Sequence, residues 1–168
     1  TSVDQLVTGE YIVVVNTGHA LGALDGSWVT AVQPTVSGNQ VTDDKGAVWT
    51  ITVSGDKVTL ADSSGKKIAP SGGNNNGIKE GNYQWAVSCE SGKFIFKGTG
   101  SDTVRLASNP GSGNKFRGYK EATVSGNPNG YPSTFTLYLL DSNTETTPTQ
   151  TPTQVTTQAP TQAPTMPA

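Results

Sequence analysis

The stretch WAVSCESGKFIF, residues 85–96, decides the fold of this chain. Apolar side chains alternate with small or polar ones on both sides of Ser91 and Gly92, which predicts a β-hairpin with one apolar face. A similar pattern is written earlier as WTITVSGDKVTL, residues 49–60. Each copy is followed by another apolar segment, at residues 104–108 and 66–70. The chain is therefore organised by an internal repeat of about forty residues.

The repeat also extends to the start of the chain, where a strand predicted over residues 11–15 opens the first of three units. Its spacing supports the match, because Tyr11 lies ten residues before Leu21, as Val58 lies ten residues before Ile68. Each unit closes with an alternating strand headed by an aromatic residue: Trp49, Trp85 and Phe135. Between the opening and closing strands we expect a further strand at residues 28–32 in the first unit and 115–119 in the third. The second unit has only a Gly/Asn-rich segment there, residues 71–77, which we interpret as a loop.

The repeat indicates the fold class. Three units of about four strands predict an all-β, antiparallel domain with three pseudo-repeats, and the β-trefoil-like barrel fits this count best. Six strands would form the barrel and six would cover it. A two-sheet β-sandwich is the alternative, since strand counts from one sequence are unreliable. The composition agrees with a turn-rich β domain, with 33% hydrophobic and 14% charged residues and 20 glycines.

The composition changes after residue 141, which divides the chain into two predicted regions. Residues 1–141 are expected to form an all-β binding domain, and residues 142–168 contain mainly Thr, Pro, Gln and Ala. Such a segment cannot bury a core and samples extended conformations. It is typical of linkers in secreted multidomain proteins, so we expect a secreted or cell-surface location and further domains of the same chain. A tail without a partner domain is the alternative.

Charge and hydropathy exclude two classes of partner. The formal net charge is −2 and no run of Lys or Arg is present. Binding of nucleic acid through its phosphates needs several clustered cations, so we expect no nucleic-acid partner. No apolar run approaches the roughly twenty residues that a membrane span requires, so we expect no membrane span.

Few residues are available for catalysis. His19 is the only histidine, and it occupies the repeat position of Lys67 and Arg105, from which we expect it to face outward. Cys89 occupies the repeat position of Val53, as a small core residue would. A zinc site, a Cys/His pair and a Ser-His-Asp triad are therefore not predicted, and no Gly-x-Ser-x-Gly motif is present.

Most of the acidic residues have an explanation in turn chemistry. Paired carboxylates for glycoside hydrolysis are not excluded by sequence alone, since 13 Asp and Glu residues are present. Asp43 and Asp44 are adjacent, but they lack the alternating oxygen ligands of an EF-hand loop. We therefore predict no enzymatic activity, no cofactor and no metal site.

Ligand binding is better supported than catalysis, through aromatic and basic residues that lie outside the repeat pattern. Trp28 follows a turn and stands beside polar residues, as the stacking platform of a sugar site does, although a lid over the barrel is an equal alternative. Lys115, Arg117 and Tyr119 alternate onto one face of a strand, for which a solvated face is the alternative. Tyr131 lies on a loop that could close over the same face. These five residues form the predicted carbohydrate-binding site.

Several short motifs resemble carbohydrate-binding domains of secreted and cell-surface multidomain proteins of anaerobic gut bacteria, of the starch-adherence type. The motifs are GEYIV (9–13), WTI (49–51), GKKIA (65–69), RLASN (105–109), FRGY (116–119) and FTLYL (135–139). The resemblance covers roughly residues 9–140. It implies a non-catalytic module that binds a polysaccharide, with an α-glucan such as starch favoured.

Ricin-type trefoil lectins give a looser comparison. Their repeat carries Gln-x-Trp, whereas here Gln84 directly precedes Trp85 and Val48 precedes Trp49. Because of this departure, the galactose-site residues of those lectins are not transferred to this chain. A protein-interaction or spacer domain is the alternative function, and an enzyme or inhibitor on the same fold ranks last.

Overall fold

Three four-strand units, related as the repeat predicts, build the protein. The computed structural model describes residues 2–140, and the predicted linker, residues 142–168, lies outside them. The first unit contains β1 (Gly9–Val15), β2 (Ala20–Asp25), β3 (Trp28–Val32) and β6 (Val48–Ser54). The second contains β7 (Lys57–Ala61), β8 (Ile68–Pro70), β9 (Ile78–Glu80) and β10 (Trp85–Glu90). The third contains β11 (Lys93–Lys97), β12 (Val104–Asn109), β13 (Lys115–Lys120) and β14 (Phe135–Leu139).

Shorter elements lie between or before these strands. They are two 3-10 turns (Val3–Gln5 and Pro110–Ser112), the strands β4 (Thr35–Ser37) and β5 (Gln40–Asp43), and the helix α1 (Glu121–Gly126). The β4–β5 hairpin is an insertion that only the first unit carries, and it pairs with neither barrel nor cap strands in the described region. No helix within residues 2–140 has the length and apolar character needed to cross a bilayer.

The first and last strands of each unit close into a barrel. The antiparallel pairings run β1–β6, β6–β7, β7–β10, β10–β11 and β11–β14, and β14 pairs with β1 again. This closed path contains six strands, two from each unit, as the sequence predicts for a β-trefoil. Because the sheet closes on itself, the two-sheet sandwich alternative is wrong.

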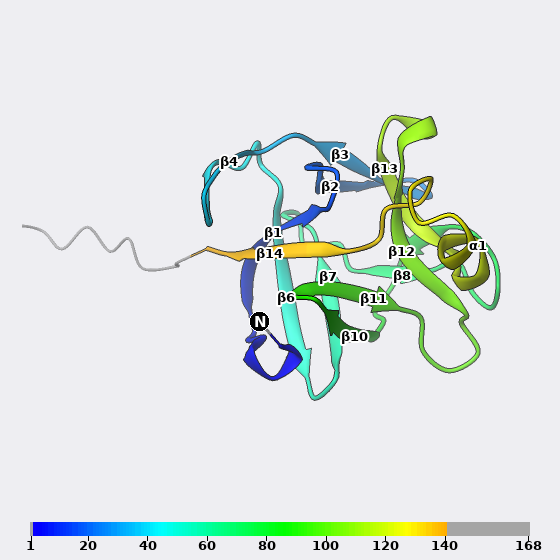
Figure 1. Cartoon of the computed structure of the whole chain (residues 1–168). Helices are drawn as coiled ribbons and strands as arrows, with labels where there is room; N and C mark the ends of the chain where they lie inside the picture. The colour runs from blue at the N-terminus through cyan, green and yellow to red at the C-terminus, as the bar shows by residue number, and fades with distance from the viewer. Residues whose placement is uncertain (1, 141–168) are drawn as a thin grey trace, which may run out of the picture.

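The second and third strands of each unit form hairpins that cap the barrel, and Figure 1 shows them grouped at one side of it. β2–β3 and β12–β13 join the main sheet, while β8–β9 forms a separate pair. β13 pairs with β3 at Phe116 and Val29, and an isolated bridge joins Gly77 to Gly118. The second unit thus has a third strand, β9, beyond the Gly/Asn-rich segment. The sequence analysis predicted only a loop in this part of the second unit and was wrong to omit the strand.

The three aromatic residues at the heads of the closing strands are core residues, as predicted. Trp49, Trp85 and Phe135 are all 0% exposed. The Trp49 indole Nε1–H donates to the carbonyl oxygens of Leu21 (3.0 Å) and Gly22 (2.8 Å). The Trp85 indole donates to the Ile68 carbonyl at 3.0 Å. Each tryptophan therefore ties the last strand of its unit to the second strand of the same unit.

Candidate functional site

Four of the five predicted site residues come together where the first and third units meet in the cap. Phe116 pairs with Val29 in an antiparallel register, so Arg117, which follows Phe116, lies opposite Trp28, which precedes Val29. The Arg117 guanidinium carbon lies 4.1 Å from the centroid of the Trp28 ring and 4.9 Å from that of Tyr119. Tyr131 packs on Tyr119 with ring centroids 4.6 Å apart. We call Trp28, Arg117, Tyr119 and Tyr131 the aromatic–arginine cluster.

Tyr119 is the buried base of this cluster. Its side chain is only 1% exposed, and it packs with Ala107 and Val124. Its hydroxyl accepts a hydrogen bond from Asn109 Nδ2 at 2.9 Å. The expectation that Tyr119 presents a ring face to a sugar is therefore corrected, because α1 and the loop before β14 cover it. Tyr119 supports Arg117 and Tyr131, while Trp28, Arg117 and Tyr131 are half-buried.

Arg117 is held by ring faces rather than by an acid. Among residues 2–140 it forms no ion pair, and its buried Nε atom has no hydrogen-bond partner. Cation–π contacts hold a guanidinium in place at about 0.5–2 kcal/mol each without using its N–H donors. The guanidinium can therefore offer hydrogen bonds to a ligand seated at Trp28.

Asp25 flanks Trp28 on its other side. It pairs with Trp28 across the two-residue turn of the β2–β3 hairpin, where Gly26 adopts a φ of 60°. The Asp25 carboxylate is exposed. Trp28 thus stands between a hydrogen-bond acceptor on β2 and a donor on β13. Because the guanidinium covers one face of the indole, a sugar ring would stack on the opposite face, with Arg117 and Asp25 on the neighbouring strands to bind its hydroxyl groups.

An ionic contact holds the helix that covers this cluster. Glu121, the first residue of α1, pairs with Arg105 on β12 and lies 3.5 Å from Lys97 Nζ. Burial would raise the pKa of Glu121, but hydrogen bonds and charge from Arg105 and Lys97 outweigh it and lower the pKa. Val124 of α1 is 1% exposed and packs in the same small core as Tyr119. This contact therefore positions the floor of the cluster.

Lys115 is the predicted site residue that the structure leaves out of the cluster. It begins β13, opposite Asn109, and its side chain is exposed. Within residues 2–140 its side chain makes no ion pair, hydrogen bond or ring contact with the cluster. Its place agrees with the solvated-face alternative.

The residues considered for catalysis or metal binding form no common site within residues 2–140. His19 is half-buried rather than outward-facing, and its Nδ1 has no partner within residues 2–140. Asp43 pairs with Lys45, and Asp44 accepts a hydrogen bond from the Gly46 amide at 2.7 Å, so both acids serve one turn. In the described range, no three His, Cys, Asp or Glu residues gather as a metal site.

Comparison with known proteins identifies the architecture. No protein-family model matches the chain, and no curated protein matches its sequence. Among solved structures it is similar to a lectin of Polyporus squamosus, bound in that structure to the epitope Neu5Acα2-6Galβ1-4GlcNAc. The match has a TM-score of 0.60 at 16% identity and covers 80% of this chain and 50% of the lectin chain. The chain has the fold of a β-trefoil lectin.

The matched lectin is a longer protein, and this chain spans about half of its length. At the level of the fold, the match agrees with the looser comparison to trefoil lectins made from the sequence. The resemblance to starch-adherence domains and the preference for an α-glucan stay predictions.

Two contributors to the cluster were missed by sequence reasoning. Helix α1 has six residues, too few to show helical periodicity, although Glu121 at its start is a weak signal. Asn109 ends β12 and reaches Tyr119 across the β12–β13 hairpin, where Asn109 pairs with Lys115. The hairpin register that brings them together is not visible in composition or alternation.

Proposed function

We propose that this chain is a non-catalytic carbohydrate-binding module, and that the aromatic–arginine cluster is its binding site. The observation that carries the proposal is the placement of the half-buried Trp28 on a strand between exposed Asp25 on β2 and Arg117 on β13, whose guanidinium lies on the Trp28 ring. Stacking on the ring contributes affinity, and the two polar groups select the arrangement of hydroxyls. The trefoil lectin fold supports this assignment.

The polysaccharide we propose is an α-glucan such as starch, on the strength of the motif resemblance. The Thr/Pro/Gln-rich residues 142–168 would link the module to further domains of the same chain, in a secreted or cell-surface protein. Linkage to other domains would raise the effective concentration of a weak module at a polysaccharide surface.

Affinity electrophoresis of the full chain tests the proposal. Native gels containing soluble starch should retard the wild type, and parallel gels should contain a β-glucan, a xylan and a uronan. Trp28→Ala should weaken retardation by at least about tenfold in Kd, which corresponds to about 1.4 kcal/mol. Trp28→Phe should retain part of the retardation, because it keeps a ring without the indole.

A matched variant away from the cluster controls for charge and stability. Lys45→Ala alters an exposed ion pair with Asp43, and starch should retard it as strongly as the wild type, each relative to its own mobility in a gel without polysaccharide. Thermal unfolding of each variant establishes that it is folded. If the wild type is retarded by none of the four polysaccharides, the carbohydrate-binding proposal is wrong. Retardation of Trp28→Ala equal to that of the wild type would remove this cluster from the site.

A further inference from the structure

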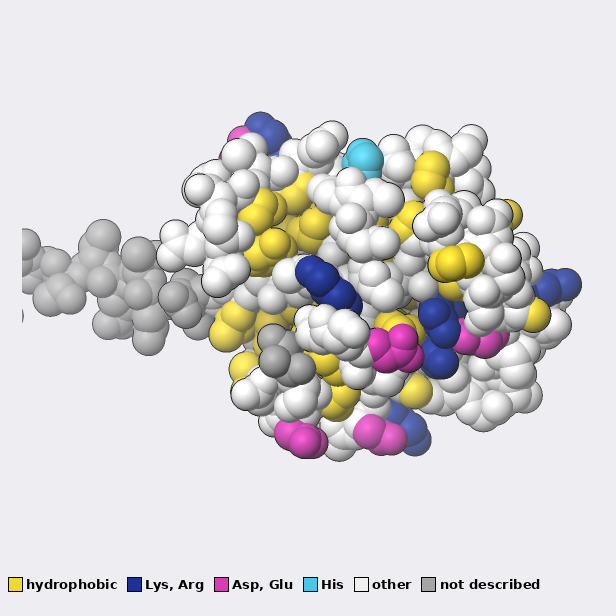
Figure 2. Space-filling view, viewed as in Figure 1, with side chains coloured by type: hydrophobic (Ala, Val, Ile, Leu, Met, Phe, Trp, Pro, Cys, Tyr) yellow, Lys and Arg dark blue, Asp and Glu magenta, His cyan; other side chains and the backbone are white. Residues whose placement is uncertain are grey.

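A second hollow lies on the wall of the barrel, away from the aromatic–arginine cluster. The inserted β4–β5 segment stands over β1 and β14 and leaves a cavity of about 380 Å³ beneath it. Figure 2 shows hydrophobic side chains gathered in this region under β4, with a Lys or Arg side chain at its edge. The cavity shares no lining residue with the cluster. Because the first unit alone carries the insertion, the other two units cannot form an equivalent hollow.

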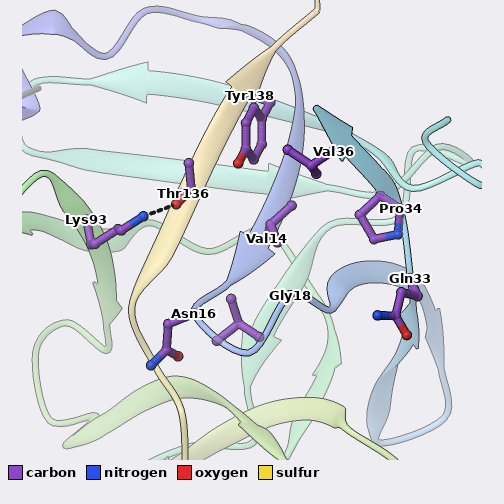
Figure 3. Close-up of a pocket in the computed structure, with 10 residues that line it drawn as sticks. Val14, Asn16, Gly18, Gln33, Pro34, Val36, Lys93, Thr136 and Tyr138 are labelled. Atoms are coloured by element: carbon purple, nitrogen blue, oxygen red, sulfur yellow. Dashed lines mark hydrogen bonds between the residues drawn. The ribbon is translucent and has the colours of Figure 1, made fainter. Parts of the chain in front are cut away.

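The hollow combines an apolar floor with a polar rim (Figure 3). Val14 of β1 and Pro34 line the hollow as buried residues, Val36 is 38% exposed, and the ring of Tyr138 stands beside them. Val14 and Tyr138 belong to a small apolar core that also contains Ile12. The floor is thus anchored in the barrel, and the inserted hairpin supplies the opposite wall.

The rim carries hydrogen-bonding groups that the protein itself does not use. Within residues 2–140, the side chains of Asn16 and Gln33 and the Tyr138 hydroxyl make no hydrogen bond, although each lines the hollow. Lys93 Nζ donates to Thr136 Oγ1 at 2.6 Å, which leaves two ammonium protons. Two amides and a phenol supply both donors and acceptors around one space.

The charged residues that line the hollow indicate which class of ligand it can bind. Among the described residues, the hollow is lined by no Asp or Glu, so it has no carboxylate for a cation. Its one cation, Lys93, is exposed and already bonded to Thr136, which makes a strong anion site unsuitable. Paired donors and acceptors over an aromatic and aliphatic floor suit a molecule with apolar ring faces and many hydroxyls.

We infer that this hollow is a second carbohydrate subsite, which takes one or two sugar residues of a neutral saccharide. The Tyr138 ring and the exposed side chain of Val36 contact the sugar's C–H groups, while Asn16 and Gln33 bind its hydroxyls. The inference does not depend on the proposed role of Trp28, because the two sites share no residue. Its volume lies within the range of about 300–1,000 Å³ typical of small-ligand sites.

Titration of the ¹⁵N-labelled full chain, followed by amide NMR shifts, tests the subsite. The probes are maltose, methyl α-glucoside, methyl β-galactoside and sodium glucuronate. At least one neutral probe should shift the amides of Asn16, Gln33 and Thr136 with a Kd of about 1 mM or somewhat weaker. The double variant Asn16→Ala/Gln33→Ala should raise that Kd at least tenfold, and Tyr138→Phe should raise it by a smaller factor.

Trp28→Ala serves as the matched control, because it alters the other site and leaves every residue of the hollow intact. It should retain the shifts at Asn16 and Gln33. The subsite is refuted if no neutral probe moves these amides, or if glucuronate alone moves them. It is also refuted if the double variant, folded by its amide spectrum, binds as the wild type does. Retardation of the wild type in starch gels would still stand in those cases, so the two proposals fail separately.

Discussion

The buried rings at positions 49, 85 and 135 show how one residue fixes the geometry of a repeat unit. Trp49 and Trp85 donate their indole N–H groups to carbonyls at equivalent positions, Leu21 on β2 and Ile68 on β8. Phe135 has no N–H to donate and packs instead against Phe96 and Phe116, at 5.5 and 6.2 Å between centroids. Two units are therefore held by a ring and a hydrogen bond, and the third by rings alone.

Trp85→Phe separates the two contributions. The substitution keeps a buried ring, as Phe135 does naturally, but it removes the bond to Ile68. We expect a loss of about 1–3 kcal/mol in the free energy of unfolding, from the hydrogen bond and the vacated volume. Trp85→Ala should cost about 3–5 kcal/mol. Urea unfolding followed by circular dichroism measures both values.

Val7→Ala is the control for these core changes, because Val7 is 52% exposed. A surface substitution of this kind should change the free energy of unfolding by no more than about 0.5 kcal/mol. A Trp85→Phe variant as stable as the wild type would show that the indole hydrogen bond contributes nothing net.

At single positions, repetition predicts burial better than it predicts exposure. The aromatic character kept at 49, 85 and 135 correctly indicated core residues, and the departure of Trp28 from that set correctly indicated a different environment. Tyr119 was misplaced because alternation states which side of a strand a residue faces but not what covers that side. Val124 and Tyr131, which cover it, come from segments that follow the strand.

At the scale of elements, helix α1 is attached to the cap chiefly through its first residue. Glu121 contacts Arg105 and Lys97, and the Glu121 amide donates to the Thr103 carbonyl at 3.0 Å. The Arg105 side chain is 14% exposed and also reaches Ser133 Oγ at 3.4 Å. One arginine thus joins the start of α1 to the segment after Tyr131, on both sides of the cluster floor.

Glu121→Gln should loosen this attachment. The variant leaves the largely buried Arg105 without its carboxylate, and partial exposure of Glu121 reduces the cost to about 1–2 kcal/mol of unfolding free energy. We also expect weaker retardation in starch gels, because Tyr131 and Tyr119 lose part of their support. Urea unfolding and affinity electrophoresis measure the two effects.

Lys45→Ala is the matched comparison, because it breaks an ion pair whose side chains are 52% and 47% exposed. It should cost clearly less unfolding free energy than Glu121→Gln does, because solvent screens an exposed ion pair. Equal losses in the two variants would mean that the Glu121 contact acts as an ordinary surface pair.

The error at β9 also belongs to the scale of elements. The strand has three residues, of which Ile78 is 1% exposed while Lys79 and Glu80 face solvent. Three residues are too few for an alternation to be recognised. Long strands such as β6 and β10 were predicted because each repeats its alternation several times, whereas the short cap strand depends on contacts with its neighbours.

For the whole molecule, the repeat count was sufficient to predict the closed barrel, but not the insertion that shapes its wall. The β4–β5 segment has no counterpart in the other units, so no comparison between units could indicate its position. The hollow over Tyr138 was missed for the same reason. Features shared by three units were predictable, and features present in one unit required the three-dimensional arrangement.

Contacts between units contribute to the stability of the whole molecule, and one of them is made by an ionised carboxylate. Asp62, 2% exposed after β7, accepts hydrogen bonds from the Leu24 amide at the end of β2 and from the Ser64 and Lys66 amides, each at 3.0 Å. The Ser64 hydroxyl donates a further bond at 2.7 Å. Burial raises the pKa of Asp62, but these four donors outweigh it, and the pKa in the folded protein lies below the ordinary value.

This lowered pKa predicts acid sensitivity. The unfolded chain binds a proton at Asp62 near pH 3.9, whereas the folded protein does so only at lower pH. The stabilisation is therefore complete above about pH 5 and is lost as the pH falls through the folded-state pKa. Glu121, whose pKa is also lowered, adds to the decline. Urea unfolding at a series of pH values between about 7 and 2 should show this loss.

Asp62→Asn should be less stable than the wild type at neutral pH by about 1–3 kcal/mol, since one amide oxygen cannot serve all four donors. It should also lose less stability on acidification, so the two stability curves converge at low pH. An Asp62→Asn curve parallel to that of the wild type would show that another acid governs the decline.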